Sequence, residues 1–243
     1  MRAVVMISSV ANPEERPDLR EQTFEPPQEK EIANDFDLIA LEAAVSLKER
    51  GVFDEVVLFS AAPRNLHLIK GLAMGADRAV WAVARYEEVT ADSVVETLLT
   101  AIAPDAETVW FAGKLGVNFE SHITAQKLAA RLSLPCLCSV SSLEYGNGLW
   151  RIKREEEGGE PTYEIGGAFV LSSDLRLATP RFPSLPNMIK ARRKPLTEVA
   201  LVHAAHESQL RSKALRVAEA RRGHCEWIDS ETLSDMISKV SMC

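Results

Sequence analysis

Cysteine is scarce in this sequence, and the residues that usually bind metals follow no ligand pattern. The 243 residues include four cysteines and five histidines. The spacing Cys136-x-Cys138 is too tight for the usual zinc site, and no second Cys or His pair lies at a matching distance. His203 and His206 are three residues apart but lack a third clear ligand. We therefore expect no metal site, and mostly reduced thiols of the kind found in cytosolic proteins.

Long apolar runs and an excess of basic charge are also missing. No run of about 18 apolar residues occurs, so no segment is expected to be embedded in a membrane. The formal net charge of −7 argues against a nucleic-acid partner, because such proteins need a net basic face. The first residues show no charged, apolar and small-residue signal layout. We therefore expect a cytoplasmic protein, or a mitochondrial matrix protein if a presequence was removed from a eukaryotic chain.

The common nucleotide and hydrolase signatures are absent as well. The sequence contains no Gly-x-Gly-x-x-Gly and no Gly-Lys-Ser/Thr, so it gives no support to a dehydrogenase or kinase function. It also offers no clear Ser/His/Asp constellation, which leaves a hydrolase as the weakest of the functions considered.

Short apolar runs alternate with segments of helical periodicity over roughly the first 140 residues. This alternation predicts an α/β fold, with a mostly parallel twisted sheet flanked by helices on both faces. A stretch with four prolines at 11–30 predicts a loop between the first strand and the first helix. The expected strands are 3–10, 55–60, 78–83, 108–112 and 135–140, and the expected helices are 37–50, 65–74, 90–102 and 121–132.

The pattern changes after Leu143. Residues 149–154 and 162–165 alternate apolar and polar side chains on either side of a glycine turn, which predicts an antiparallel hairpin. Two further strands are expected at 168–172 and 199–202.

The C-terminal segment has little core of its own. Its last expected element is a helix at 230–240 that Ser230 caps. We divide the chain into a nucleotide-binding α/β domain at 1–196 and a C-terminal arm at 197–243. The arm packs on a partner subunit or, alternatively, on its own domain.

Ligands of parallel sheets bind at the carboxyl ends of the strands, which directs attention to the loop after 108–112. Gly113 and Gly116 allow the backbone to approach a ligand closely. The helix that follows offers free N–H groups, which together with its dipole favour a phosphate. Those N–H groups belong to His122, Ile123 and Thr124, and Ser121 is the expected cap. The alternative is a plain strand-to-helix turn.

Acidic residues are missing from 175–197, although the whole chain is acidic. Six cations lie in this segment: Arg176, Arg181, Lys190, Arg192, Arg193 and Lys194. Three prolines exclude a helix through its middle, and Asn187 is expected to cap a short helix that starts at Met188. The rigid loop would present Phe182, Leu185 and Met188 to solvent or to a partner. A docking element and an ordinary basic surface loop are both compatible with this pattern.

Several segments resemble electron transfer flavoprotein beta subunits, in the same order along the chain. They read NDFDLIALEAAVSLKERG, GLAMGADRAV, FAGKLGVNFESHITAQKLAARLSLP, IKREEEGG and DLRLATPRFPSLPNMIKARRKPL. Together they lie within residues 3–196. The resemblance implies an adenine nucleotide alpha hydrolase-like fold and an electron carrier in which a flavin, rather than a side chain, performs the chemistry.

The resemblance also implies partners and cofactors. An alpha subunit would form a heterodimer with this chain and hold most of the FAD, while this subunit would hold AMP or a second FAD. Electrons would arrive from flavin-dependent dehydrogenases and leave to a quinone reductase or another acceptor.

The same resemblance implies residue roles. Nucleotide contacts would come from Met6, Asn34, Asp35, Phe36, Asp37, Ala61, Gly113, Lys114, Gly116, Val117, Asn118, Ser121, His122, Ile123 and Thr124. Arg154 would hold the flavin region at the subunit interface, and Glu155 would take part in interdomain contact. A solvated turn is the alternative for these two residues. Leu185 would insert into a dehydrogenase, supported by Met188, Lys190, Arg192 and Arg193.

The sequence departs from the family pattern around the nucleotide site. Ser8-Ser9-Val10 replaces a family Lys-x-Val, and Asp35 replaces a proline. The nucleotide loop ends in Glu120-Ser121-His122-Ile123 rather than in the family's Gln-containing sequence. The choice between AMP and FAD stays open. A nucleotide-binding regulatory or stress-type module on the same fold is the alternative function.

Overall fold

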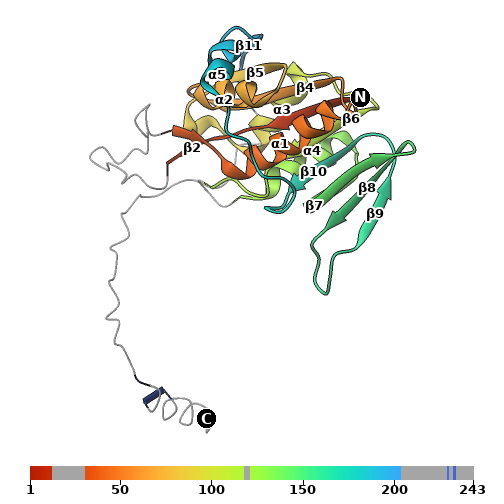
Figure 1. Cartoon of the computed structure of the whole chain (residues 1–243). Coiled ribbons are helices and arrows are strands. Elements are labelled where there is room, and N and C mark those ends of the chain that lie inside the picture. Colours follow the sequence, from red (N-terminus) through yellow and green to blue (C-terminus); the bar gives the residue numbers. More distant parts are fainter. Residues whose placement is uncertain (13–30, 118–120, 204–228, 230–231, 234–243) are drawn as a thin grey trace.

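The computed structural model describes residues 1–12, 31–117, 121–203, 229 and 232–233. In these residues nine strands form one sheet (Figure 1). Their order across the sheet is β11 (Leu196–Ala200), β5 (Arg78–Val83), β4 (Glu55–Ala62), β1 (Arg2–Met6), β6 (Thr108–Ala112), β10 (Phe169–Ser173), β7 (Cys136–Gly146), β8 (Leu149–Arg154) and β9 (Thr162–Ile165). Neighbours from β11 to β7 pair in parallel, and β7–β8 and β8–β9 pair antiparallel. The expected α/β class with its antiparallel hairpin is confirmed.

Helices cover both faces of the parallel strands. The core on one face is built with α1 (Asp35–Glu49), α2 (Leu66–Met74) and the buried Ala191 of α5 (Leu185–Ala191). The core on the other face is built with α3 (Ala91–Ala101) and α4 (Ile123–Leu132). A short 3-10 helix spans Tyr86–Glu88. Figure 1 shows β8 and β9 projecting beyond these helical layers.

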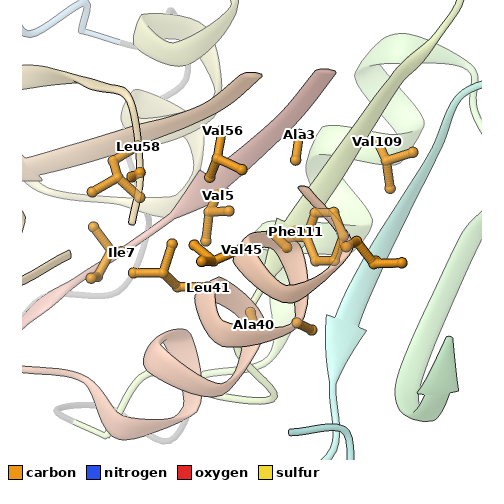
Figure 2. Close-up of a cluster of buried hydrophobic side chains, with 14 of the residues drawn as sticks. Ala3, Val5, Ile7, Ala40, Leu41, Val45, Val56, Leu58, Val109 and Phe111 are labelled. Carbon is orange, nitrogen blue, oxygen red and sulfur yellow. The ribbon is translucent and has the colours of Figure 1, made fainter. Parts of the chain in front are cut away.

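Helix α1 packs along the centre of the sheet. Its Ala40, Leu41 and Val45 face the central strands, and all three are buried (Figure 2). Val5 of β1 and Phe111 of β6 lie opposite them in the same cluster. Burying each large apolar side chain of this kind contributes about 1.5–3 kcal/mol, so α1 is fixed firmly against β1 and β6. The N-terminal residues of α1 are therefore held at the carboxyl ends of these strands.

The winding of the sheet reverses at β1. The chain runs outward from β1 to β4 and β5 on one side, and then returns to β6 and β10 on the other. Open α/β sheets bind ligands in the crevice outside the strand carboxyl ends at such a switch point. The topology thus directs the search for a site to the loops that follow β1, β4 and β6.

Several strand ends differ from the sequence prediction. Strand β1 ends at Met6 instead of continuing to residue 10, because Ser9–Ala11 forms a separate strand, β2, that pairs antiparallel with β3 (Glu31–Ala33). Strand β7 continues to Gly146, since its second half pairs with β8. The last strand lies at Leu196–Ala200 and pairs with β5, so the sheet extends past the boundary placed at residue 196.

Two expected helix caps are wrong, and a third lies outside the described residues. Helix α4 begins at Ile123, with His122 rather than Ser121 in the cap position. Helix α5 begins at Leu185, because Ser184 accepts the N–H of Asn187, which therefore lies inside the helix. Near the C-terminus, the Asp229 carboxylate accepts the N–H of Thr232 at 2.8 Å. Ser230 itself, and most of the arm expected at 197–243, lie outside the described residues.

Candidate functional site

The Asp37 carboxylate ties together the three elements that meet at the switch point. Its Oδ2 accepts the N–H of Ser8, just after β1, at 2.7 Å. Its Oδ1 accepts the N–H of Gly113, just after β6, at 3.0 Å. Asp37 lies in the first turn of α1 and is buried. The sequence prediction counted it among nucleotide contacts, whereas here its oxygens are directed at backbone N–H groups.

Gly113 lies against the start of α1 with no room for a side chain. A Cβ atom at this position would lie 2.8 Å from the backbone N of Asp37 and 2.8 Å from the carbonyl carbon of Phe36, and closer still to the Asp37 carboxylate. Real Cβ atoms essentially never approach backbone atoms so closely, so glycine is required here for close approach of two backbone segments. Gly116, three residues later, has its nearest such neighbour at 4.0 Å.

Asp37 makes the fold sensitive to pH. Burial raises the pKa of Asp37 to about 6, although the N–H groups of Ser8 and Gly113 and the Asn34 side chain oppose this shift. Between the unfolded pKa and about pH 6, the folded chain therefore binds more protons than the unfolded chain, and stability decreases as the pH rises through this window.

Asp37→Asn removes this titration. We expect the free energy of unfolding of the wild type, minus that of Asp37→Asn, to decrease by about 2 kcal/mol from pH 4 to pH 7. Urea unfolding at a series of pH values measures it, and a pH-independent difference would contradict the burial argument.

Asn34 holds the start of α1 against the loop after β6. Its Nδ2 donates to the Leu115 carbonyl oxygen at 2.8 Å, and its backbone N–H donates to Ser8 O at 3.0 Å. Its Oδ1 is buried and has no hydrogen-bond partner among the described residues. Next to it, Asp35 is exposed and Phe36 is half-buried. An unpaired buried acceptor is costly unless a donor from a ligand or water reaches it.

The loop after β6 returns to meet the beginning of α4. Gly116 donates its N–H to Ser121 O at 3.0 Å, and the His122 ring Nδ1 lies 2.8 Å from the Lys114 carbonyl oxygen. These contacts bring the loop glycine to the N-terminus of a ten-residue helix. Ile123 is about half exposed. The first N–H groups of a helix have no partner within the helix, so this end of α4 can donate to an anion.

Lys114 was expected to face a nucleotide, but its charge is already paired. Its Nζ lies 2.9 Å from Oδ2 of the buried Asp174, which also accepts from Arg176 Nε at 2.9 Å. Burial opposes ionisation of Asp174, but the hydrogen bonds from Arg176 and Lys114 lower its pKa to about 2. Arg176 continues to Glu155 and Glu160 at 3.3 and 2.7 Å. This network joins the loop after β6 to the β8–β9 turn, and no local sequence pattern pointed to it.

The β8–β9 turn is ordered by contacts at both of its ends. Glu155 donates its N–H to Ser139 O at 3.2 Å, and Arg154 Nε lies 3.2 Å from Glu156 Oε1. Arg154 is half-buried, while the Glu155 side chain is about half exposed. The turn is thus more than a solvated charge run, because Arg176 and Ser139 attach it to the parallel part of the sheet.

A buried serine and histidine lie beneath the loop after β4, and sequence reasoning missed them. Ser60 Oγ and His67 Nε2 are 2.6 Å apart, and both residues are buried. Burial lowers the pKa of His67 to about 3, so this imidazole stays neutral near pH 7 and links β4 to α2. Ala61 follows Ser60 and is half-buried, and Met6 at the end of β1 is buried. The contact between Ser60 and His67 therefore stabilises the start of the loop after β4.

The basic segment, residues 175–197, contains both paired and unpaired cations. The Arg181 guanidinium bonds both Glu42 and Glu49 of α1, and these bonds raise its pKa. Lys194 donates to the carbonyl oxygens of Leu72 and, at 2.5 Å, of Ala76 beyond the end of α2. In the part of the chain that the structure describes, the remaining cations of the cluster carry no ion pair and are exposed: Lys190, Arg192 and Arg193.

The apolar side chains beside these cations point in different directions. Phe182 is 95% exposed and Leu185 74% exposed, as the rigid-loop prediction requires. Ile189, which was not predicted, is also exposed. Met188 was expected to face solvent or a partner, which is wrong: it packs against the core as part of the inner face of α5. The exposed apolar set around α5 is therefore Phe182, Leu185 and Ile189, and Leu175 at the start of the segment is exposed as well.

The structure brings several predicted nucleotide contacts to one edge of the sheet. Met6, Asn34, Asp37, Ala61 and Gly113 lie on or beside the carboxyl ends of β1, β4 and β6. Asn118 lies outside the described residues, and Val117, which precedes it, is partly exposed.

No helix within the described ranges is both long and apolar enough to cross a membrane. Those same ranges contain no group of three or more metal-ligating side chains placed to hold an ion.

Comparison with known proteins assigns this arrangement to a family. A family model described as the electron transfer flavoprotein domain matches residues 24–204. An electron transfer flavoprotein subunit beta from Bradyrhizobium diazoefficiens is 32% identical over 210 residues, which cover 85% of this chain and 83% of the relative. The chain belongs to the electron transfer flavoprotein beta subunit family. The resemblance inferred from the sequence motifs is thereby confirmed.

Other members of the electron transfer flavoprotein beta family match over similar spans. The mitochondrial subunit beta of Arabidopsis thaliana is 33% identical over 69% of this chain and 68% of its own length. The subunit beta of Mus musculus is 27% identical over 87% of this chain and 84% of its own length. The described switch point, basic segment and β8–β9 turn all lie inside the matched residues 24–204, apart from the end of β1.

Proposed function

We propose that this chain is the beta subunit of an electron transfer flavoprotein and works as a heterodimer with an alpha subunit. The observation that carries the proposal is the cradle at the switch point, where Gly113 contacts the first turn of α1 and Asn34 presents a buried oxygen that no described residue hydrogen-bonds. Membership of the family supports the same assignment. Electrons would pass from flavin-dependent dehydrogenases to a quinone reductase or another acceptor.

The cradle is proposed to hold the adenine nucleotide of this subunit, either AMP or a second FAD. Its residues fit such a group: the α4 N-terminus offers N–H donors to a phosphate, and Asn34 Oδ1 can accept from the base or ribose. The Asp37 carboxylate is directed at Ser8 and Gly113. It therefore shapes the cradle without placing a negative charge against the phosphate.

A flavin held mainly by the alpha subunit would supply the electron chemistry. The residues of this chain proposed to reach that region are Arg154 and Glu155, on the turn that Arg176 and Ser139 fix to the sheet. A guanidinium beside a flavin stabilises negative charge that develops on it. The chain would thus position and tune the cofactor, and none of its side chains would form or break a covalent bond in the transfer.

Co-expression with an alpha subunit tests the assignment. We expect a yellow heterodimer from which denaturation releases a flavin and one further nucleotide, AMP or FAD, identified by mass spectrometry. A colourless monomer that binds ATP would instead favour the regulatory nucleotide-binding module and would overturn the proposal.

The exposed end of α5 is proposed to dock flavin-dependent dehydrogenases. Leu185 opens the helix with its side chain 74% exposed, and Lys190, Arg192 and Arg193 follow it without ion pairs to any described residue. A rigid apolar anchor beside free cations fits a pocket on an acidic partner, to which the cations would steer it.

Leu185→Ala is expected to slow electron delivery from a partner dehydrogenase by about tenfold without loss of bound flavin. Stopped-flow measurement of flavin reduction checks this. Leu66→Ala is the matched control, because Leu66 is the first residue of α2 and is 54% exposed. Equal rates for Leu185→Ala and the wild type with every dehydrogenase tested would exclude Leu185 as the anchor.

A further inference from the structure

Two cysteine side chains lie together on β7, outside the site described above. The sulfur atoms of Cys136 and Cys138 are 3.8 Å apart. Both side chains are half-buried on the face of the sheet that α4 covers, while Leu137 between them packs into the opposite core. The two thiols are therefore neighbours that solvent can reach, and the electron-transfer proposal gives them no role.

An irregularity in β7 lies beside the pair. In a regular strand, residues i and i+2 lie about 7 Å apart along the chain, which is too far for a disulfide. Here two β7 residues, Cys138 and Ser139, oppose the single β10 residue Ser172. Ser139 has the left-handed φ of 56°, and its N–H donates to Ser172 Oγ at 3.2 Å. Such a bulge bends the strand locally, and this bend accompanies the short distance between the two sulfurs.

The surroundings make the two thiols chemically unequal. A hydrogen bond from Cys136, together with donors from Ser172 and Gln126 and the charge of Arg154, lowers the pKa of Cys138. The Gln126 amide nitrogen lies 3.5 Å from its sulfur. The same contact with Cys138, and burial, raise the pKa of Cys136. Because the thiolate is the reactive form, Cys138 is the nucleophile of the pair and Cys136 the thiol that reacts second.

We propose that Cys136 and Cys138 form a redox-active dithiol that small-molecule disulfides such as oxidised glutathione convert into an intrachain disulfide. The Cys138 thiolate attacks one sulfur of the small disulfide, and one small thiolate leaves. Cys136 then loses its proton to that thiolate or to water, and its sulfur attacks Cys138 and expels the second small thiolate. The protein loses two electrons and two protons, and one small disulfide becomes two small thiols.

The position of the pair predicts a disulfide that is readily reduced again. A bridge between residues i and i+2 has to be accommodated in an already bent strand, and strained disulfides are the more reducible ones. The same bulge holds the β8–β9 turn, because Ser139 O accepts the N–H of Glu155 at 3.2 Å. Closure of the disulfide would therefore change the anchoring of Glu155. This inference does not depend on bound flavin or on any partner.

The test uses the full chain with Cys225→Ser and Cys243→Ser, so that only the pair can react. The protein is incubated with oxidised glutathione, quenched with an alkylating agent and examined by intact mass and peptide mapping. We expect a product lighter by two hydrogen atoms, with the loss mapped to the peptide that contains Cys136 and Cys138, and we expect reduced glutathione to reverse it. Two thiols that stay open to alkylation, or a mixed disulfide that persists on this protein, would overturn the proposal.

Single variants separate the two roles. In the same background, Cys136→Ser is expected to stop at a stable glutathione adduct on Cys138. Cys138→Ser is expected to form an adduct on Cys136 about tenfold more slowly, because burial still opposes ionisation of Cys136, whereas Ser172 and Gln126 favour the thiolate of Cys138. Equal rates for the two variants would contradict the assigned order of attack. The disulfide measurement itself uses the protein with both cysteines, so it does not depend on how well either variant folds.

Discussion

Gly113→Ala is expected to destabilise the fold by about 3 kcal/mol and to prevent retention of nucleotide in the heterodimer. The added methyl would overlap the backbone of Phe36 and Asp37, which cannot move without withdrawing α1 from the sheet. The hydrogen bond from the Gly113 N–H to Asp37 would be lost in the same displacement. Urea unfolding, followed through the buried Trp110 and Trp150, measures the first effect, and mass spectrometry of released nucleotide measures the second.

Gly116→Ala is the matched control for this substitution. It makes the same change in the same loop, where the new methyl has its nearest neighbour at 4.0 Å. We expect a change of at most about 0.5 kcal/mol in the free energy of unfolding. If the two variants lost the same stability, the contact between Gly113 and α1 could not be what shapes the cradle.

The second large effect is expected for Arg181→Ala, at about 3 kcal/mol. Arg181 is bidentate to Glu42 and also bonds Glu49, and the Glu42 side chain is only 9% exposed. Removing the guanidinium would leave a buried carboxylate without its partner, which is far more costly than losing an exposed pair. The segment that leads into α5 would keep the backbone hydrogen bond from residue 181 to Glu42 but lose the side-chain bonds to α1. Urea unfolding measures the change in stability.

Arg131→Ala is the control for bidentate geometry without burial. Arg131 bonds both oxygens of Glu96 at 2.6 and 3.1 Å, but its side chain is 58% exposed and that of Glu96 32%. Exposed pairs of this kind contribute about 0–1 kcal/mol. A loss of stability for Arg181→Ala no greater than that for Arg131→Ala would show that burial of Glu42 does not set the energy. The basic segment would then be held mainly by its prolines and apolar contacts.

Local sequence patterns predicted most elements of the parallel sheet and its helices, because apolar periodicity and glycine stops are local signals. The position of Gly113 after a parallel strand pointed to a site, whereas the start of α1 was added to that site through family resemblance. What the local patterns missed depends on residues distant in sequence. Glu42 is 139 positions from Arg181, and no window of neighbouring residues shows that this arginine is already paired.

Contacts between residues that are distant in sequence also explain the errors at α5 and β7. Asn187 and Ser184 are both good caps in isolation, and only the path of the chain selects Ser184. Met188 turns inward because α5 packs beside α2, which its own sequence does not reveal. The bulge beside Cys136 and Cys138 is seen only in the pairing of β7 with β10, which lies more than 30 positions away in sequence. Tertiary pairing, rather than propensity, sets these details.

The most direct test of the account is electron relay by the purified heterodimer of this chain with an alpha subunit. A flavin-dependent dehydrogenase and its substrate are mixed with the heterodimer, and flavin absorbance is followed before and after an acceptor is added. The account predicts bleaching that depends on the dehydrogenase and is reversed by the acceptor. A fully assembled, flavin-loaded heterodimer that no dehydrogenase can reduce would contradict it.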